Sequence, residues 1–193
     1  MDAGHAVLAR AMSPRINSRA RFSRDRGPSF QAQSNACFDA FTLRARLETM
    51  TRTELLLFIR EHSLGVVATK SPSGQPQASV VGIAVSDAFE ILFDTLANTR
   101  KVQNLRHSPE VACVVGWDEE QTVQIEGIAD EPQGHELLRL QRHYFAQFPD
   151  GRVRLAWPGI TYVRIRPNWI RYSDFRDAET ETAEFSGSEL FDA

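Results

Sequence analysis

Short runs of apolar residues, alternating with polar positions and broken by turn residues, fill the middle of the chain. These runs are rich in Val, Ile, Thr and aromatic residues, and Gly, Pro, Ser and Asp separate them. Such a pattern predicts strands that are joined by tight turns. The expected strands are 64–70, 77–85, 89–95, 111–117, 122–130 and 160–167, with 169–174 as a candidate extension of the last.

Helical spacing of apolar residues predicts three helices around these strands. The first begins at Thr51, whose hydroxyl and the carboxylate of Glu54 form a capping-box pattern. The second is a short helix over Arg100–His107, which Pro109 ends, and the third follows Pro132. The apolar faces expected are Leu55, Leu56, Phe58 and Ile59 for the first helix, and Leu137, Leu140, Tyr144 and Phe148 for the third.

This order of elements indicates a mainly β fold, a small antiparallel barrel with flanking helices. Strands and helices do not alternate as they would in a doubly wound parallel sheet. No GxGxxG motif follows a strand, so a dinucleotide-binding Rossmann site has no support.

The domain is expected at 50–174, between two tails. Residues 1–49 are rich in Arg and Ser without a sustained apolar period, which predicts disorder. Two alternatives for this segment are an organelle transit peptide and a stretch upstream of a working start at Met50. Residues 175–193 are acidic and rich in Ser and Thr, and are expected to form a solvated tail.

Composition narrows the classes of partner and compartment. The net charge of −3 argues against nucleic-acid binding by bulk electrostatics. No apolar run approaches a membrane span, and the first residues lack the apolar core of a secretory signal. The two cysteines, Cys37 and Cys113, form no CxxC pair, so neither a disulfide framework nor a zinc site is supported. We expect a cytoplasmic protein.

One helix start carries unusual charges. Arg100 and Lys101 occupy the first turn after the expected N-cap Thr99. Cations there oppose the helix macrodipole, at a cost of about 0.3–1 kcal/mol each. Free N–H groups, the Thr99 hydroxyl and both cations would instead converge on a bound phosphate. A solvated basic turn is the alternative interpretation, and these residues alone do not separate the two.

The same stretch resembles the pyridoxamine 5′-phosphate oxidase-like family. In that family an aromatic-x-Thr strand end precedes a short loop, a Ser/Thr-Arg-Lys turn, a helix and an Asn-Pro-x-Val strand start. The matching residues here are Phe93-Asp94-Thr95, Thr99-Arg100-Lys101 and Ser108-Pro109-Glu110-Val111. Over residues 53 to 173 the order of elements also matches. The resemblance implies an FMN-binding split barrel, a homodimer, and an FMN phosphate held by the Arg-Lys pair.

Other family positions carry over one at a time. Ser79 and Ala84 stand where the true oxidases have Arg and Lys, and only Ser79 retains a hydrogen-bond donor. The resemblance further implies backbone contacts from Val80 and Val81 and a flavin-side Trp169. It also implies an amide or hydroxyl from the strand after Trp117, for which Gln121, Thr122 and Gln124 are the candidates. Tyr144 matches a substrate-binding Tyr, but Phe148 replaces a substrate-binding Arg, and no Arg-x-His signature follows Tyr172.

Two classes of function follow from this resemblance. The first is an FMN-dependent oxidoreductase acting on a small molecule, with authentic pyridoxamine 5′-phosphate oxidation disfavoured by the missing substrate residues. The second is a non-catalytic flavin-binding or ligand-sensing module. Related split barrels that use F420 or haem form a further alternative.

Overall fold

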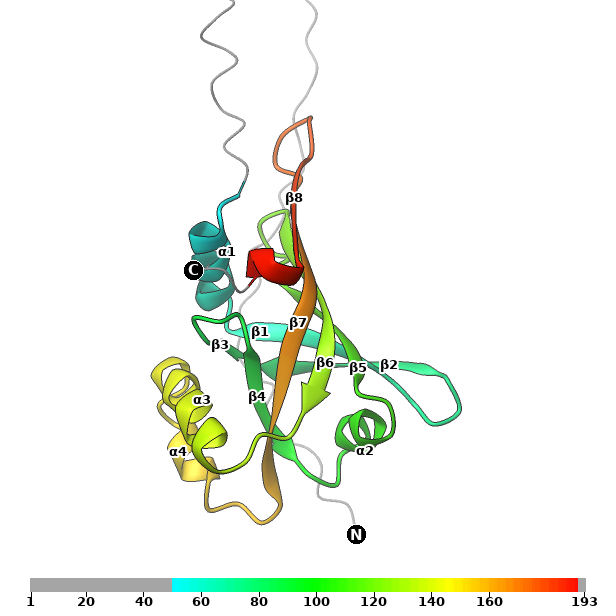
Figure 1. The fold of residues 1–193 in the computed structure, drawn as a ribbon, viewed down its shortest axis with the longest axis vertical. Coiled ribbons are helices and arrows are strands. Elements are labelled where there is room, and N and C mark those ends of the chain that lie inside the picture. Colours follow the sequence, from blue (N-terminus) through cyan, green and yellow to red (C-terminus); the bar gives the residue numbers. More distant parts are fainter. Residues whose placement is uncertain (1–49, 191–193) are drawn as a thin grey trace, which may run out of the picture. The chain divides into compact units, whose positions relative to one another are not determined.

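The computed structural model describes residues 50–190 (Figure 1). The expectation of disorder for residues 1–49 lies outside the described residues. Between residues 50 and 190, no helix is both long enough and apolar enough to cross a bilayer.

An eight-stranded antiparallel sheet forms the centre of the fold (Figure 1). Its strands run in the order β2-β1-β5-β6-β7-β4-β3, and β8 also pairs with β7. The strands are β1 (Leu64–Lys70), β2 (Pro76–Gly82), β3 (Ala84–Val85), β4 (Ile91–Leu96), β5 (Glu110–Val115), β6 (Gln121–Asp130), β7 (Ile160–Asp174) and β8 (Glu181–Ser186). Together with its flanking helices, this sheet is the split barrel that the sequence predicts.

Helices flank the sheet at three places (Figure 1). They are α1 (Arg52–Glu61), α2 (Arg100–His107), α3 (Gly134–Gln147), α4 (Gly151–Arg154) and the 3-10 helix η1 (Gly187–Leu190). The predicted capping box is present, because Thr51 accepts from the backbone of Glu54 and the Glu54 carboxylate accepts from the backbone of Thr51. The predicted bounds of α2 are confirmed.

Strand β7 connects the parts of the sheet. Its first six residues pair with β4, its last six pair with β8, and β6 pairs along most of its length. The register with β6 shifts between Glu126 and Gly127, which leaves Asn168 as an extra residue in β7. At this bulge a Cβ on Gly127 would lie 2.4 Å from the carbonyl oxygen of Arg166, so only glycine fits.

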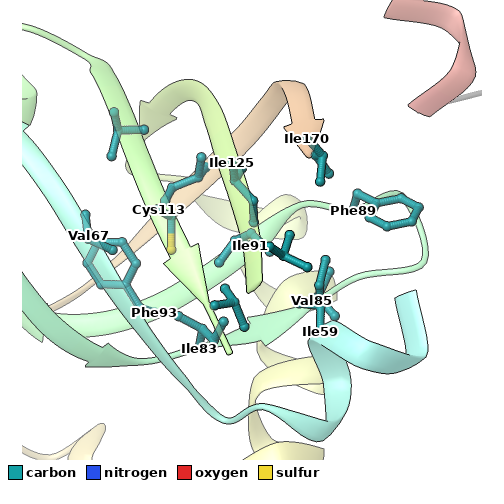
Figure 2. Packing of buried hydrophobic residues seen from close by; sticks show 14 of the residues in the cluster. Ile59, Val67, Ile83, Val85, Phe89, Ile91, Phe93, Cys113, Ile125 and Ile170 are labelled. Carbon is teal, nitrogen blue, oxygen red and sulfur yellow. The ribbon is translucent and has the colours of Figure 1, made fainter. Parts of the chain in front are cut away.

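Two apolar clusters hold the helices to the sheet. The larger cluster lies inside the curved sheet and includes Ile59 of α1, Phe93 of β4 and Cys113 of β5 (Figure 2). The smaller cluster joins α3 to β3, β4 and β7 through side chains that include Leu140, Tyr144 and Tyr162. The predicted apolar faces of α1 and α3 therefore supply core residues.

The expected strand 77–85 is two strands in the structure. After Gly82 the chain changes partner, since β2 pairs with β1 whereas β3 pairs with β4. Between them, the Ile83 backbone N–H donates to the carbonyl of Ser63 over 2.9 Å. A continuous β-branched run does not reveal this exchange, because it depends on which distant strands are available.

The expectation of a solvated tail from residue 175 is wrong for residues 181–190. Residues 181–186 form β8 against β7, and the side chain of Leu190 in η1 is 0% exposed. Arg52 of α1 donates to the Leu190 carbonyl over 3.2 Å. The acidic composition of this segment concealed its alternation, in which Phe185 packs against the larger cluster.

Leu190→Ala should lower the free energy of unfolding by about 2–5 kcal/mol, because it removes a fully buried side chain. Urea denaturation of the purified protein measures the change. Leu138→Ala is the matched control, since Leu138 is 60% exposed on α3. Equal stability of the two variants would contradict the packing of η1 on the core.

Candidate functional site

The loop between β4 and α2 carries the predicted cationic turn. It is fixed by hydrogen bonds from the Thr99 backbone to the Leu96 carbonyl, 3.0 Å, and from the Ala97 backbone to the Gly159 carbonyl, 2.8 Å. Thr99 is the N-cap by backbone geometry, but its hydroxyl donates to the Leu96 carbonyl rather than capping the helix. The first N–H groups of α2 therefore receive no side-chain cap.

A cavity of about 630 Å³ opens beside this turn. It lies between α2 and the ends of β1 and β2. Its lining residues are Thr69, Gln77, Ala78, Ser79, Asn98, Thr99, Arg100 and Lys101. Four residues chosen from sequence, Ser79, Thr99, Arg100 and Lys101, thus meet at one cavity.

Lys101 is half-buried at the edge of this cavity. Its ammonium donates to the Thr95 hydroxyl over 3.2 Å, and Thr95 in turn lies 3.4 Å from the Thr99 hydroxyl. Burial lowers the pKa of the Lys101 ammonium below its usual value, because desolvation disfavours the charged form. Thr95, also chosen from sequence, therefore orients this cation.

The two cavity cations differ from Arg154 and Arg164, which both have carboxylate partners. Arg154 pairs with Asp94 at 2.6 Å, and the buried Arg164 pairs with Glu90 at 2.9 Å. Between residues 50 and 190, by contrast, no carboxylate lies within ion-pair distance of Arg100 or Lys101. Their positive charge is available to an anion in the cavity.

A polar network under the cavity escaped the sequence analysis. The Asn104 side-chain N–H₂ donates to the Thr69 hydroxyl at 2.9 Å and to the side-chain amide oxygen (Oε1) of Gln77 at 3.0 Å. Asn104 lies between the buried Val102 and Leu105. A buried amide on the apolar face of a short helix was the available signal, because such a group must find polar partners.

Gln121, Thr122 and Trp169 do not line this cavity. Gln121 is the first residue of β6, and it donates to the Tyr172 hydroxyl and to the Asp174 carboxylate of β7. Strand spacing places it roughly 15–20 Å along the sheet from the level of Thr69. The Trp169 indole donates to Glu184 of β8 over 3.3 Å. Within one chain these residues are separate from the cationic turn.

Val80 and Tyr144 have different surroundings from those expected. Val80 lies on β2, 60% exposed, and is not among the lining residues. Tyr144 is fully buried in the smaller cluster, and its hydroxyl accepts from Arg154 over 3.2 Å. Burial raises the pKa of this phenol. Within one chain the Tyr144 ring packs against Phe148 and Tyr162, and its contact with a substrate stays a prediction.

The sheet, the cationic turn and the cavity can now be compared with known proteins. The family model described as pyridoxamine 5′-phosphate oxidase matches residues 51–174. The chain belongs to the pyridoxamine 5′-phosphate oxidase-like FMN-binding split-barrel family. The match covers the domain from the start of α1 to the end of β7.

Curated relatives in this family are pyridoxine/pyridoxamine 5′-phosphate oxidases. A sequence from Burkholderia mallei is 35% identical over 92 residues, which is 47% of this chain and 41% of the relative. A sequence from Trichormus variabilis is 34% identical over the same length and the same shares. The chain thus spans about two fifths of the length of the curated relatives it matches.

Solved split-barrel structures share the fold at low sequence identity. A haem-binding protein from Mycobacterium smegmatis has a TM-score of 0.61 and 18% identity, covering 72% of this chain and 60% of the other. A pyridoxamine 5′-phosphate oxidase-related, FMN-binding protein from Nostoc punctiforme has a TM-score of 0.51 and 12% identity, covering 70% and 95%. These similarities establish the architecture.

Lys101→Met should stabilise the protein at neutral pH by about 0.5–1 kcal/mol, because it removes a desolvated, unpaired charge but keeps the aliphatic part of the side chain. Since the folded-state pKa is lowered, the destabilisation by Lys101 is largest below that pKa. It disappears as the pH rises towards the unfolded value of 10.5.

Thermal unfolding of both proteins across this pH range tests the sign. Lys70→Met is the control, because Lys70 is exposed at the end of β1. A destabilised Lys101→Met protein at neutral pH would show that Lys101 has a structural partner instead.

Proposed function

We propose that the cavity holds the phosphate of FMN and that the protein is an FMN-dependent oxidoreductase acting on a small molecule. The observation that carries this proposal is the pair of unpaired cations, Arg100 and Lys101, at a cavity with hydroxyl donors. Membership of the FMN-binding split-barrel family supports the choice of anion.

The residues present fit a flavin phosphate. A phosphate monoester carries close to two negative charges at neutral pH, and two cations line the cavity. The Ser79 hydroxyl and the uncapped N–H groups of α2 supply neutral donors. The cavity volume of about 630 Å³ is within the usual range for small-ligand sites.

The chain's own contribution would be binding and orientation. The lining residues of this cavity include neither a carboxylate nor a histidine, so no obvious acid or base faces it. When bound, FMN supplies the hydride or electron chemistry. Lys101, oriented by Thr95, and Arg100 would hold the phosphate end and so fix where the ring extends.

Pyridoxamine 5′-phosphate itself fits this chain poorly as a substrate. Phe148, at the position where the family oxidases have an Arg, packs in the smaller cluster and cannot pair with a phosphate. Tyr144 is buried beside it. We therefore propose that the substrate is a different small molecule. Assaying the purified, flavin-loaded protein with a panel of reductants and acceptors distinguishes an enzyme from a protein that only binds flavin.

Haem is a second candidate cofactor, because a haem-binding protein shares the fold. Haem iron usually takes an axial His, Cys, Met or Tyr, and the cavity described above is lined by none of these. FMN is thus favoured over haem, and an absorption spectrum of the purified protein distinguishes FMN, F420 and haem.

We also propose a reducing cytoplasm, since among the described residues Cys113 is a free thiol.

We further propose a homodimer formed on the outer sheet face. Strand register places Val66, Val80 and Val114 on one side of β2, β1 and β5. Ala68 and Ala112 extend this outer apolar face, and Val80 is 60% exposed. A second copy would cover the face symmetrically. It would also bring a partner's ring-binding residues, for which Gln121, Thr122 and Trp169 are the candidates, towards the flavin.

Arg100→Ala/Lys101→Ala should weaken FMN binding by about a hundredfold or more, because each cation makes charge-assisted hydrogen bonds worth about 1.5–3 kcal/mol. Flavin fluorescence titration measures the affinity. Lys70→Ala/Arg142→Ala removes the same charge at exposed positions outside this cavity. If the cavity variant and this control bind FMN equally, the site assignment is wrong.

Val80→Lys should shift the protein from dimer to monomer at micromolar concentration, because it introduces a charge into the proposed interface. Sedimentation velocity measures the change. Val153→Lys, at a residue that is 71% exposed on α4, is the matched control. An unchanged dimer in the Val80 variant, or a monomeric wild-type protein, would overturn the proposed interface.

A further inference from the structure

The network under the cavity controls which atoms face a ligand. Asn104 is 3% exposed and Thr69 is 5% exposed, whereas the Gln77 side chain is half-buried on the edge strand β2. Thr69 and Gln77 line the cavity, and Asn104 lies behind them. Asn104 therefore contacts two cavity residues without lining the cavity itself.

Hydrogen-bond direction follows from the chemistry of the Asn104 amide. Its nitrogen can only donate, so the Thr69 oxygen and the Gln77 carbonyl oxygen must both accept. Thr69 then retains a hydroxyl hydrogen, and Gln77 retains both hydrogens of its own amide nitrogen. Among the described residues, no acceptor is recorded for either group.

We propose that Asn104 is a positioning residue that turns the Gln77 amide N–H₂ and the Thr69 hydroxyl hydrogen towards a phosphate in this cavity. The inference rests on the proposed FMN function and extends its phosphate site to neutral donors. With Ser79, these groups complete the donor set beside Arg100 and Lys101. An anion in the cavity would accept hydrogen bonds from both groups at once.

The reverse orientation would oppose anion binding. If Asn104 accepted instead of donating, Gln77 would present its carbonyl oxygen to the cavity, where it would repel a phosphate. Asn104→Asp imposes this reversal, because a carboxylate only accepts, and it also adds a negative charge behind the cavity. Gln77→Leu removes the amide donor while keeping similar bulk on an edge strand.

The test compares FMN with riboflavin, which has the same ring but no phosphate. Flavin fluorescence titration of the full chain should show FMN affinity reduced about tenfold by Gln77→Leu, with riboflavin affinity unchanged. Asn104→Asp should weaken FMN binding further. Gln133→Glu makes the same change from amide to carboxylate at an exposed residue outside this cavity and should leave FMN affinity unchanged.

Each contrary result has a defined meaning. Wild-type FMN affinity in Gln77→Leu, or an equal loss of riboflavin affinity, overturns this inference. A folded Asn104→Asp protein that binds FMN normally also overturns it; if that variant fails to fold, Gln77→Leu decides alone. Loss of FMN in Arg100→Ala/Lys101→Ala without loss in Gln77→Leu leaves the proposed function standing, whereas a wild-type protein that binds no FMN overturns both.

Discussion

The backbone hydrogen bonds of β7 are the constraint on which the described fold depends. This single strand pairs with β4, β6 and β8, so its hydrogen bonds fix the positions of all three strands relative to one another. The pairing with β4 fixes where that strand ends, and the cationic turn begins directly after it. The Ala97–Gly159 hydrogen bond ties the same loop to the residue preceding β7. The position of Arg100 and Lys101 is thus set by the sheet.

Several polar groups at the cavity lack partners within the described chain. Lys101 is desolvated without a carboxylate partner, and the donors of Thr69 and Gln77 are held in place by Asn104. Elsewhere in the described chain, buried charge is neutralised, as in the pairing of Arg164 with Glu90 and Asp130. Such local destabilisation is typical of binding sites in general.

Helices and strands that depend on neighbouring residues could be predicted from the sequence. Features that depend on contacts between distant residues could not. The capping box and the bounds of α2 depend on neighbouring residues and were predicted correctly. The division of 77–85 and the pairing of β8 depend on distant strands, so composition and alternation were insufficient. The cationic turn was found because its charges conflict with the helix dipole, but Asn104 has meaning only beside Thr69 and Gln77.

The bulge at Gly127 has a consequence for the evolution of the fold. The Arg166 carbonyl occupies the space that any side chain would need, so substitution there is opposed by backbone geometry alone. A glycine retained at this point across distant relatives would reflect the close approach of two strands and would carry no information about chemistry. Any lineage of this barrel that keeps the bulge between β6 and β7 therefore inherits the same restriction, whatever it binds elsewhere.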